Sequence, residues 1–248
     1  STPWDIAMKE NKKLRYLCLV GMDADMMVRC IGRVDYPSLR EFQRKVVELT
    51  KKARKMRITT PAGTDVTFDN DPTRPVTLED GYAETPGPHF MAGQIGWAPV
   101  FESINGVIAF DGSLVPPVGL LKIHVKLHVK NGKVMKIEGA KEATEFEAWL
   151  RSFNGPNMLM MAHMCYGFHP GAKLTGNILE DERVWGGTEW GLGNVGPMYL
   201  PPHGKPAASH TDGICLNSSV WLDEVQLTDK GRIMHPKLVD LAKKLGKT

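Results

Sequence analysis

Cysteine, net charge and long apolar runs are all scarce in this sequence, and each scarcity excludes a class of protein. The 248 residues include 4 cysteines without a CxxC pair, too few for a disulfide scaffold and typical of a reducing cytoplasm. The 31 basic and 28 acidic residues give a net charge of +3, too balanced to indicate nucleic acid or an anionic membrane as a partner. No run approaches the roughly 18–20 apolar residues of a membrane helix, and we expect no signal peptide.

Three segments have the pattern of an amphipathic helix. The first begins near Ser38, which we predict as the N-cap of a capping box completed by Glu41. Its apolar stripe runs from Leu39 to Met56 at alternating spacings of three and four. Two shorter helices are predicted over residues 142–153 and 235–246.

Strand patterns fill most of the remaining chain. A buried strand is expected over residues 14–20, and a hairpin around Ala62-Gly63. A second hairpin turns at Asn131-Gly132 after strict apolar alternation over residues 121–129. These elements predict an α+β fold with a mostly antiparallel sheet, flanking helices and long loops. The first fifty residues look like the end of another domain, because a lone strand and helix cannot bury themselves well, and we expect a missing or partner domain there.

Four of the eight histidines give little indication of chemistry. His124 and His128 alternate with lysines on the polar face of the second hairpin, where a solvated surface is the simpler interpretation. His235 precedes a proline at a helix start and is expected at the surface, and His203 lies in a PPHGKP loop.

His210 and Asp212 have the pattern of metal ligands. They are two residues apart in SHTDG (209–213), so both side chains point to one side of an extended segment. Two histidines and one carboxylate form the ligand set that leaves open positions on a mononuclear metal. His163, in an apolar strand, is the natural third ligand, and His169 at the end of the following turn is its rival.

The chain resembles the aminopeptidase T type metallopeptidases and their relatives, the 2,5-dihydroxypyridine dioxygenases, over roughly residues 45–230. The resemblance is carried by blocks in a shared order, among them AGTDVTF (62–68), GYAETPGPHFMAGQIGWAP (81–99), INGVIAFDGSL (104–114), NGKVMKIEG (131–139), AHMCYGFHPGAKLTGNILEDERVWGGTEWGLGN (162–194) and SHTDG (209–213). Full-length relatives carry an additional N-terminal α/β domain. The resemblance therefore implies that residues 58–248 form a metal-binding catalytic domain and that residues 1–57 are a remnant of the N-terminal α/β domain or a subunit-contact segment. It also implies a homo-oligomer or a partner subunit that supplies the missing part.

The two branches of this superfamily differ in their metal ligands. Two positions that hold a glutamate and a histidine in the peptidases are occupied by Gln94 and Trp190 in this chain. The resemblance therefore implies that the two-metal site of the peptidases lacks two of its ligands here. The dioxygenase pattern is kept, with His163 followed by His210 and Asp212. This resemblance implies mononuclear Fe(II), with Zn or Mn as alternatives.

The implied reaction is the opening of a hydroxylated N-heterocyclic or aromatic ring, a small-molecule substrate. A base must take the phenolic proton; His89 is the first candidate, with Tyr166 or His169 as alternatives. The expected substrate contacts are Gln94, Trp97 and Trp190.

Two other functions stay open on the sequence. The sequence of residues 174–194 is more similar to the peptidases than to the dioxygenases. This similarity favours a Zn or Mn hydrolase of a cyclic amide or peptide-like bond, in which Gln94 or Glu189 would orient the substrate. The short N-terminus favours a non-catalytic subunit of a larger assembly. The acidic turn at residues 180–182 is expected to be solvated and structural rather than a set of metal ligands.

Overall fold

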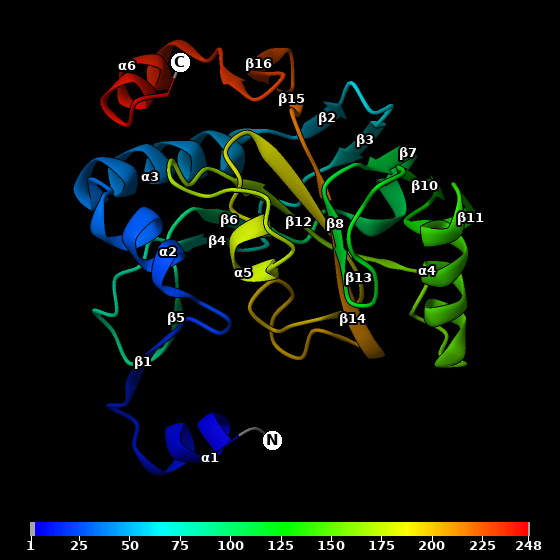
Figure 1. Cartoon of the computed structure of the whole chain (residues 1–248), viewed down its shortest axis with the longest axis horizontal. Coiled ribbons are helices and arrows are strands. Elements are labelled where there is room, and N and C mark those ends of the chain that lie inside the picture. Colours follow the sequence, from blue (N-terminus) through cyan, green and yellow to red (C-terminus); the bar gives the residue numbers. More distant parts are fainter. Residues whose placement is uncertain (1–2, 248) are drawn as a thin grey trace.

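The computed structural model describes residues 3–247, with only the backbone for residues 3–5, and has the expected α+β architecture (Figure 1). Ser1 and Thr2, at the start of the predicted 1–57 segment, and Thr248 lie outside the described residues. Its helices are α1 (Pro3–Glu10), α2 (Ala24–Met27), α3 (Tyr36–Lys52), α4 (Lys141–Ser152), α5 (Ile178–Asp181) and α6 (Pro236–Lys244), with a π-helical turn η1 (Val28–Gly32) and a 3₁₀ turn η2 (Phe101–Ser103).

Two large antiparallel sheets account for most of the strands. The eight-stranded sheet has the order β11 (Lys133–Glu138), β10 (Val125–Lys130), β7 (Asn105–Phe110), β3 (Asp65–Asp69), β2 (Lys55–Thr59), β15 (Ser219–Leu222), β16 (Val225–Asp229) and β17 (Arg232–Ile233). The seven-stranded sheet has the order β4 (Val76–Glu79), β6 (Gln94–Trp97), β12 (Met161–Gly167), β13 (Gly187–Val195), β14 (Lys205–Cys215), β8 (Ser113–Val115) and β9 (Gly119–Leu120). A separate parallel pair joins β1 (Arg15–Cys18) to β5 (Gly87–Phe90).

One continuous core joins the two large sheets to α3. Phe68 on β3 meets Trp190 on β13 edge to face, with ring centroids 5.5 Å apart. Phe42 on α3 meets Phe168, just beyond β12, at 5.3 Å. Every residue of β12 is buried, so both faces of this strand are covered. A strand buried on both faces can present one face to the hydrophobic core and the other to a functional site.

The first long helix begins earlier than the capping box predicted. Asp35 is the N-cap: its carboxylate accepts from the Ser38 backbone at 3.1 Å and from the Ser38 hydroxyl at 2.6 Å. Ser38 therefore lies inside the helix, and the capping box with Glu41 is wrong. An aspartate is an equally good cap, and Pro37 fits the first turn. Met56 lies in β2, beyond the end of α3, but is buried in the same core.

Both hairpins are confirmed. β2 pairs with β3, and β10 pairs with β11 through Asn131 and Gly132, whose φ angles of 51° and 71° suit a tight hairpin turn. The predicted strand before this turn starts four residues too early at residue 121, because β10 begins at Val125 and Ile123 is 52% exposed. His128 lies on the solvated face, as expected, 3.2 Å from Glu138.

The strand predicted as buried near the N-terminus is only half-buried. Among the described strands β1 pairs only with β5, its residues alternate between exposed and intermediate, and Leu17 is 37% exposed. Figure 1 shows α1 and β1 standing apart from the two large sheets. A strand in a two-stranded pair apart from the large sheets buries less of its surface, which explains the difference from the expectation.

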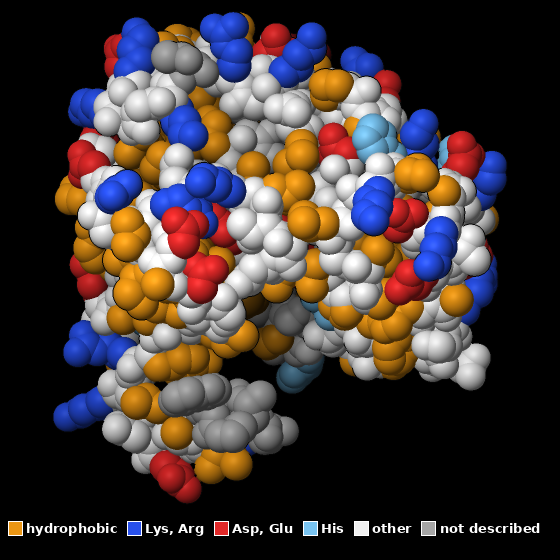
Figure 2. Space-filling model, viewed as in Figure 1, with side chains coloured by type: hydrophobic (Ala, Val, Ile, Leu, Met, Phe, Trp, Pro, Cys, Tyr) orange, Lys and Arg blue, Asp and Glu red, His pale blue; other side chains and the backbone are white. Residues whose placement is uncertain are grey.

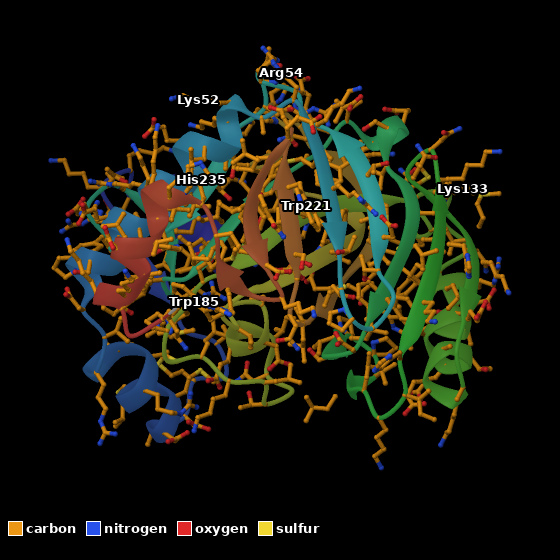
Figure 3. All side chains as sticks on the ribbon, turned by 90° about the horizontal axis from the view of Figure 1, so that it is seen from above. Lys52, Arg54, Lys133, Trp185, Trp221 and His235 are labelled. Carbon is orange, nitrogen blue, oxygen red and sulfur yellow. The ribbon has the colours of Figure 1, made fainter. Side chains whose placement is uncertain are left out.

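His235 is also more buried than expected. It is the N-cap of α6, where its Nδ1 atom accepts from the backbone of Lys237 at 3.2 Å, and it is 8% exposed. Figure 3 shows His235 between α6 and α3, and Trp221 and Lys133 on separate strands of the eight-stranded sheet.

The proposed division at residue 57 stays a prediction. α3 contributes Phe42 and Val46 to the core that also contains the large sheets. Within residues 3–247, no helix has the length and apolar content needed to cross a membrane.

Candidate metal site

Three neighbouring strands of the seven-stranded sheet bring the predicted metal ligands together. β12 carries His163, and β14 carries His210 and Asp212. β13 lies between them and carries Glu189. We call these four residues the histidine–carboxylate cluster. Their donor atoms approach one another because alternate residues of a strand face the same side of the sheet.

The distances within the cluster are those of polar groups in direct contact. His210 Nε2 lies 2.9 Å from Asp212 Oδ1, and His163 Nε2 lies 3.4 Å from the same oxygen. His163 Nε2 is also 2.7 Å from Glu189 Oε1. The two imidazoles stack with ring centroids 5.0 Å apart and an interplanar angle of 16°. Tyr199 stacks on the other side of His163 at 4.6 Å.

Gly191 makes room for these two rings. It lies on β13 directly opposite Asp212. A Cβ atom at this position would stand 2.5 Å from Cε1 of His163 and 2.9 Å from Cε1 of His210. The two imidazoles can therefore occupy the face of the sheet only because this residue has no side chain.

The donor set fits a divalent transition metal. One ligand atom from each of His163, His210 and Asp212 lies within 4.8 Å of the others. Both histidines direct Nε2 toward Asp212. Among residues 3–247, no lysine or arginine forms an ion pair with Asp212 or Glu189. Two carboxylates, Glu189 buried and Asp212 largely buried, that contact imidazoles and no basic side chain of residues 3–247 favour a bound cation.

The charges of the cluster act on one another. Burial lowers the pKa of His210, but attraction to Asp212 and the hydrogen bond between them outweigh this effect and raise the pKa to about 9. Burial raises the pKa of Glu189, and the neighbouring Asp212 carboxylate raises it further. Such mutually perturbed groups are typical of functional sites.

Comparison with known proteins identifies the family. The family model described as 2,5-dihydroxypyridine 5,6-dioxygenase matches residues 8–235.

The chain belongs to this dioxygenase family.

A 2,5-dihydroxypyridine 5,6-dioxygenase from Pseudomonas putida is 25% identical over 201 residues, which are 76% of this chain and 57% of the relative. The chain thus spans little more than half the length of that relative.

Two solved structures share the fold. A 2,5-dihydroxypyridine dioxygenase from Pseudomonas putida KT2440 superposes with a TM-score of 0.81 at 19% identity, covering 96% of this chain and 70% of that one. AmpT from Thermus thermophilus superposes with a TM-score of 0.62 at 14% identity, covering 82% and 56% of the two chains. The fold is therefore common to both branches of the resemblance.

Gln94 lies at the cluster, but its amide is already engaged. It sits on β6, next to β12, and its Nε2 atom donates a short hydrogen bond to Glu189 Oε2. Gln94 therefore contacts a residue of the cluster through the group that we expected to bind substrate.

Three aromatic candidates face the opposite side of the sheet. Met164 pairs with both Trp97 and Trp190, so these residues share the core face of their strands. Trp97 donates to Asn70 at 2.9 Å and lies 4.8 Å from the ring of Tyr166. This placement corrects the expectation that Trp97, Trp190 and Tyr166 act at the site: strand alternation turns all three away from His163.

His169 is a buried histidine with both ring nitrogens bonded to the backbone. Its Nε2 atom lies 2.9 Å from the Cys30 carbonyl, and its Nδ1 accepts from Gly171 at 3.1 Å. Burial lowers its pKa to about 4. It is six residues beyond His163 along an extended segment, roughly 20 Å in a fully extended chain. The structure therefore assigns it neither the role of ligand nor that of base.

His89 lies at a cavity of about 260 Å³ between β4, β5 and the loop before β14, lined also by Glu79, Phe90 and Met198. Met198 is adjacent in sequence to Tyr199, which stacks on His163. His89 Nε2 is 2.7 Å from the Thr85 carbonyl. A carbonyl only accepts, so Nε2 carries the proton and Nδ1 of the neutral ring has a free lone pair. The catalytic role of His89 stays a prediction.

Beside the cluster lies a second buried polar group, which we call the arginine–glutamate network: Arg29, Glu79, Glu180, Glu182 and Arg183. Arg183 is fully buried and donates short hydrogen bonds to the Glu79 and Glu182 carboxylates. It also donates to the Met91 and Leu179 carbonyls at 2.8 and 2.7 Å. Arg29 binds Glu180 through both terminal nitrogens.

The acidic turn at residues 180–182 is therefore structural, as expected, but it is not solvated. Glu180 and Asp181 are buried, and Asp181 accepts from the backbone of Thr175 at 2.7 Å and of Gly176 at 3.1 Å. The expectation of a solvated turn failed because two arginines reach two of its three carboxylates: Arg29, which is distant in sequence and partly buried, and Arg183, which directly follows the turn and is fully buried.

The sequence interpretation missed part of the cluster. We compared Trp190 with the peptidase histidine, whereas the residue of β13 that faces His163 is Glu189. Glu189 had been considered only for the hydrolase alternative. Strict alternation along GTEWG, counted from the glycine at position 191, would have placed Glu189 on the side of the ligands. Nothing comparable in the sequence indicates that Tyr199 stacks on His163.

Proposed function

We propose that this chain provides the catalytic part of a metal-dependent dioxygenase that opens the ring of a hydroxylated N-heterocycle, with Fe(II) as its metal. The observation that carries this proposal is the convergence of the donor atoms of His163, His210 and Asp212 within 4.8 Å of one another. Two imidazoles and one carboxylate are the ligand set of mononuclear non-haem iron oxygenases. Membership in the 2,5-dihydroxypyridine 5,6-dioxygenase family supports the substrate class.

In this proposal His163, His210 and Asp212 hold the metal. When bound, Fe(II) supplies open positions for oxygen and for a substrate hydroxyl, and the redox chemistry that places both oxygen atoms in the product. The protein's part is to orient the ring, to exclude water and to move one proton.

His89 is the proposed acceptor of that proton. Its Nδ1 atom has a free lone pair because Nε2 is held by the Thr85 carbonyl. The cavity that it lines is partly apolar, with Leu78, Phe90 and Met198 around it. A planar heterocycle in this cavity would lie beside His89, and its phenolic proton would pass to His89 Nδ1.

The hydrolase alternative retains one supporting observation. The cluster contains a second carboxylate, Glu189, hydrogen-bonded to Gln94, and the fold is shared with AmpT. A Zn- or Mn-dependent enzyme could use such a carboxylate to accept a proton from metal-activated water. A non-catalytic role has no comparable support, because the ligands converge.

The test combines metal content with oxygen uptake. We expect anaerobically purified protein supplied with Fe(II) to bind about one iron per chain and to consume oxygen with 2,5-dihydroxypyridine. His163→Ala should lose both properties, while His128→Ala, at an exposed histidine, should keep them. Hydrolysis of a peptide-like substrate with Zn or Mn, and no oxygen uptake with iron, would establish the alternative instead.

A further inference from the structure

Glu189 is placed among the metal ligands rather than behind them. It is 1% exposed, and it projects from β13 between the strands that carry His163 and Asp212. Its Oε1 atom approaches the same Nε2 atom of His163 that faces Asp212. A carboxylate that only oriented the imidazole would more simply bind the nitrogen on the far side of the ring, as outer hydrogen-bond partners of metal-bound histidines do.

The separations between donor atoms match those around a single ion. Two donors at about 2.1 Å from one metal stand about 3.0 Å apart at a right angle and about 3.4 Å apart at a tetrahedral angle. The observed separations are 2.9 Å from His210 Nε2 to Asp212 Oδ1 and 3.4 Å from His163 Nε2 to Asp212 Oδ1. The separation of 2.7 Å between His163 Nε2 and Glu189 Oε1 belongs to the same series after a small outward shift.

The second carboxylate oxygen of Glu189, Oε2, is fixed by a hydrogen bond from outside the cluster. Gln94 donates to Oε2, so Oε1 is directed toward the histidines. Gln94 is itself fixed by its place on β6, and Gln43 donates to its carbonyl at 3.4 Å. Carboxylates that bind metals are commonly oriented by such an outer hydrogen bond.

The charge of Glu189 has no other partner of comparable strength. Glu79 and Glu182, buried nearby, are paired with Arg183. The ion pairs of the described residues give Glu189 only His163. Cys165, on the same face of β12, also lies within 4.8 Å of the donor atoms of His163 and Glu189.

We propose that Glu189 is a fourth protein ligand, so that the site offers two imidazoles and two carboxylates. The inference rests on the proposed metal-dependent function and extends it. With four protein ligands instead of three, fewer positions on the bound metal would be open to oxygen and substrate.

The deciding experiment is an anaerobic crystal structure of the wild-type protein loaded with Co(II). We expect a Glu189 oxygen within about 2.3 Å of the ion together with His163, His210 and Asp212. A Glu189 oxygen beyond 3 Å with the other three ligands in place would overturn the fourth ligand and leave the proposed metal site intact. No metal at these residues would overturn both.

Titration with Co(II) in solution gives a second readout. Glu189→Gln keeps the shape and the contact with Gln94 but removes the charge. We expect it to weaken Co(II) binding by at least about 100-fold, the upper end of what loss of an outer hydrogen bond costs. Glu182→Gln is the matched control, a buried carboxylate paired with arginine, and Cys165→Ser tests the neighbouring thiol; both should bind within about threefold of wild type. A loss below tenfold for Glu189→Gln would contradict the proposal.

Discussion

The histidine–carboxylate cluster and the arginine–glutamate network lie side by side in one molecule and differ in the partners of their carboxylates. In the network, Arg183 divides its donors among two carboxylates and two carbonyls. In the cluster, the two carboxylates have no arginine or lysine among the described residues, and they face the Nε2 atoms of two histidines. The first is complete as it stands, whereas the second has the donors for a cation.

Two histidines on the same stretch of chain make the contrast sharper. His169 is hydrogen-bonded to the arginine–glutamate network, because its backbone N–H donates to the Arg183 carbonyl. Both of its ring nitrogens are also hydrogen-bonded to backbone groups. His163 leaves Nδ1 unpartnered and directs Nε2 at two carboxylates. A buried histidine is therefore a candidate ligand when its nitrogens lack backbone partners, and burial alone does not distinguish the two roles.

The largest expected effect is on the network. Arg183→Met leaves the Glu79 and Glu182 carboxylates buried without their cation and should lower the free energy of unfolding by about 3–5 kcal/mol. Urea denaturation measures it. Arg151→Met, at an exposed pair with Glu147, should change stability by less than about 0.5 kcal/mol. If the folded Arg183→Met protein also lost Co(II) binding, the separation between network and cluster would be wrong.

Acid should act on stability through His169. Its folded-state pKa of about 4 lies below the ordinary value of 6.5, so between these values the unfolded chain takes up a proton that the folded protein excludes. Stability from this group is complete above pH 6.5 and falls as the pH drops toward 4, by about 2 kcal/mol at pH 5.

His169→Gln should remove this part of the pH dependence, measured as the difference in unfolding free energy between pH 7 and pH 5. His128→Gln, at an exposed histidine, should retain the wild-type slope. An unchanged slope in His169→Gln would show that His169 is not the group responsible.

A smaller effect on metal binding is expected at Gly191, the glycine that makes room for the two imidazoles of the cluster. Gly191→Ala places a methyl group against both imidazoles and should weaken Co(II) binding roughly tenfold, about 1.4 kcal/mol, while the fold is kept. Gly196→Ala is the matched control, because its nearest contact would be Met198 at 3.8 Å. Equal metal affinity in the two variants would mean that the histidines bind metal in a different orientation.

The smallest effect is expected at Tyr166. Its hydroxyl is buried without a hydrogen-bond partner and its ring packs on Trp97 on the core face of β12. Tyr166→Phe should leave Co(II) affinity and oxygen uptake within about twofold of wild type and change stability by less than about 1 kcal/mol. A loss of oxygen uptake with intact metal binding would restore Tyr166 as a catalytic residue.

Much of the local structure could be predicted because it depends on neighbours in the chain. The hairpin at Asn131-Gly132 forms because both residues accept positive φ. α4 and α6 follow apolar periodicity, and the pairing of His210 with Asp212 on one side follows from strand alternation. Where two local signals competed, as between Asp35 and Ser38 at the start of α3, the prediction missed by three residues.

The sequence by itself determined the α+β elements, the histidine and carboxylate residues available as ligands, and the family that they resemble. Only the tertiary structure decided which face of each strand meets which neighbour. As a result, three aromatic side chains pack in the core: Trp97, Tyr166 and Trp190. The ring of His169 is hydrogen-bonded to backbone groups, and Glu189 lies beside His163. The physical reason is that alternation divides a strand's residues between two faces, whereas the packing of whole sheets decides which face becomes the site.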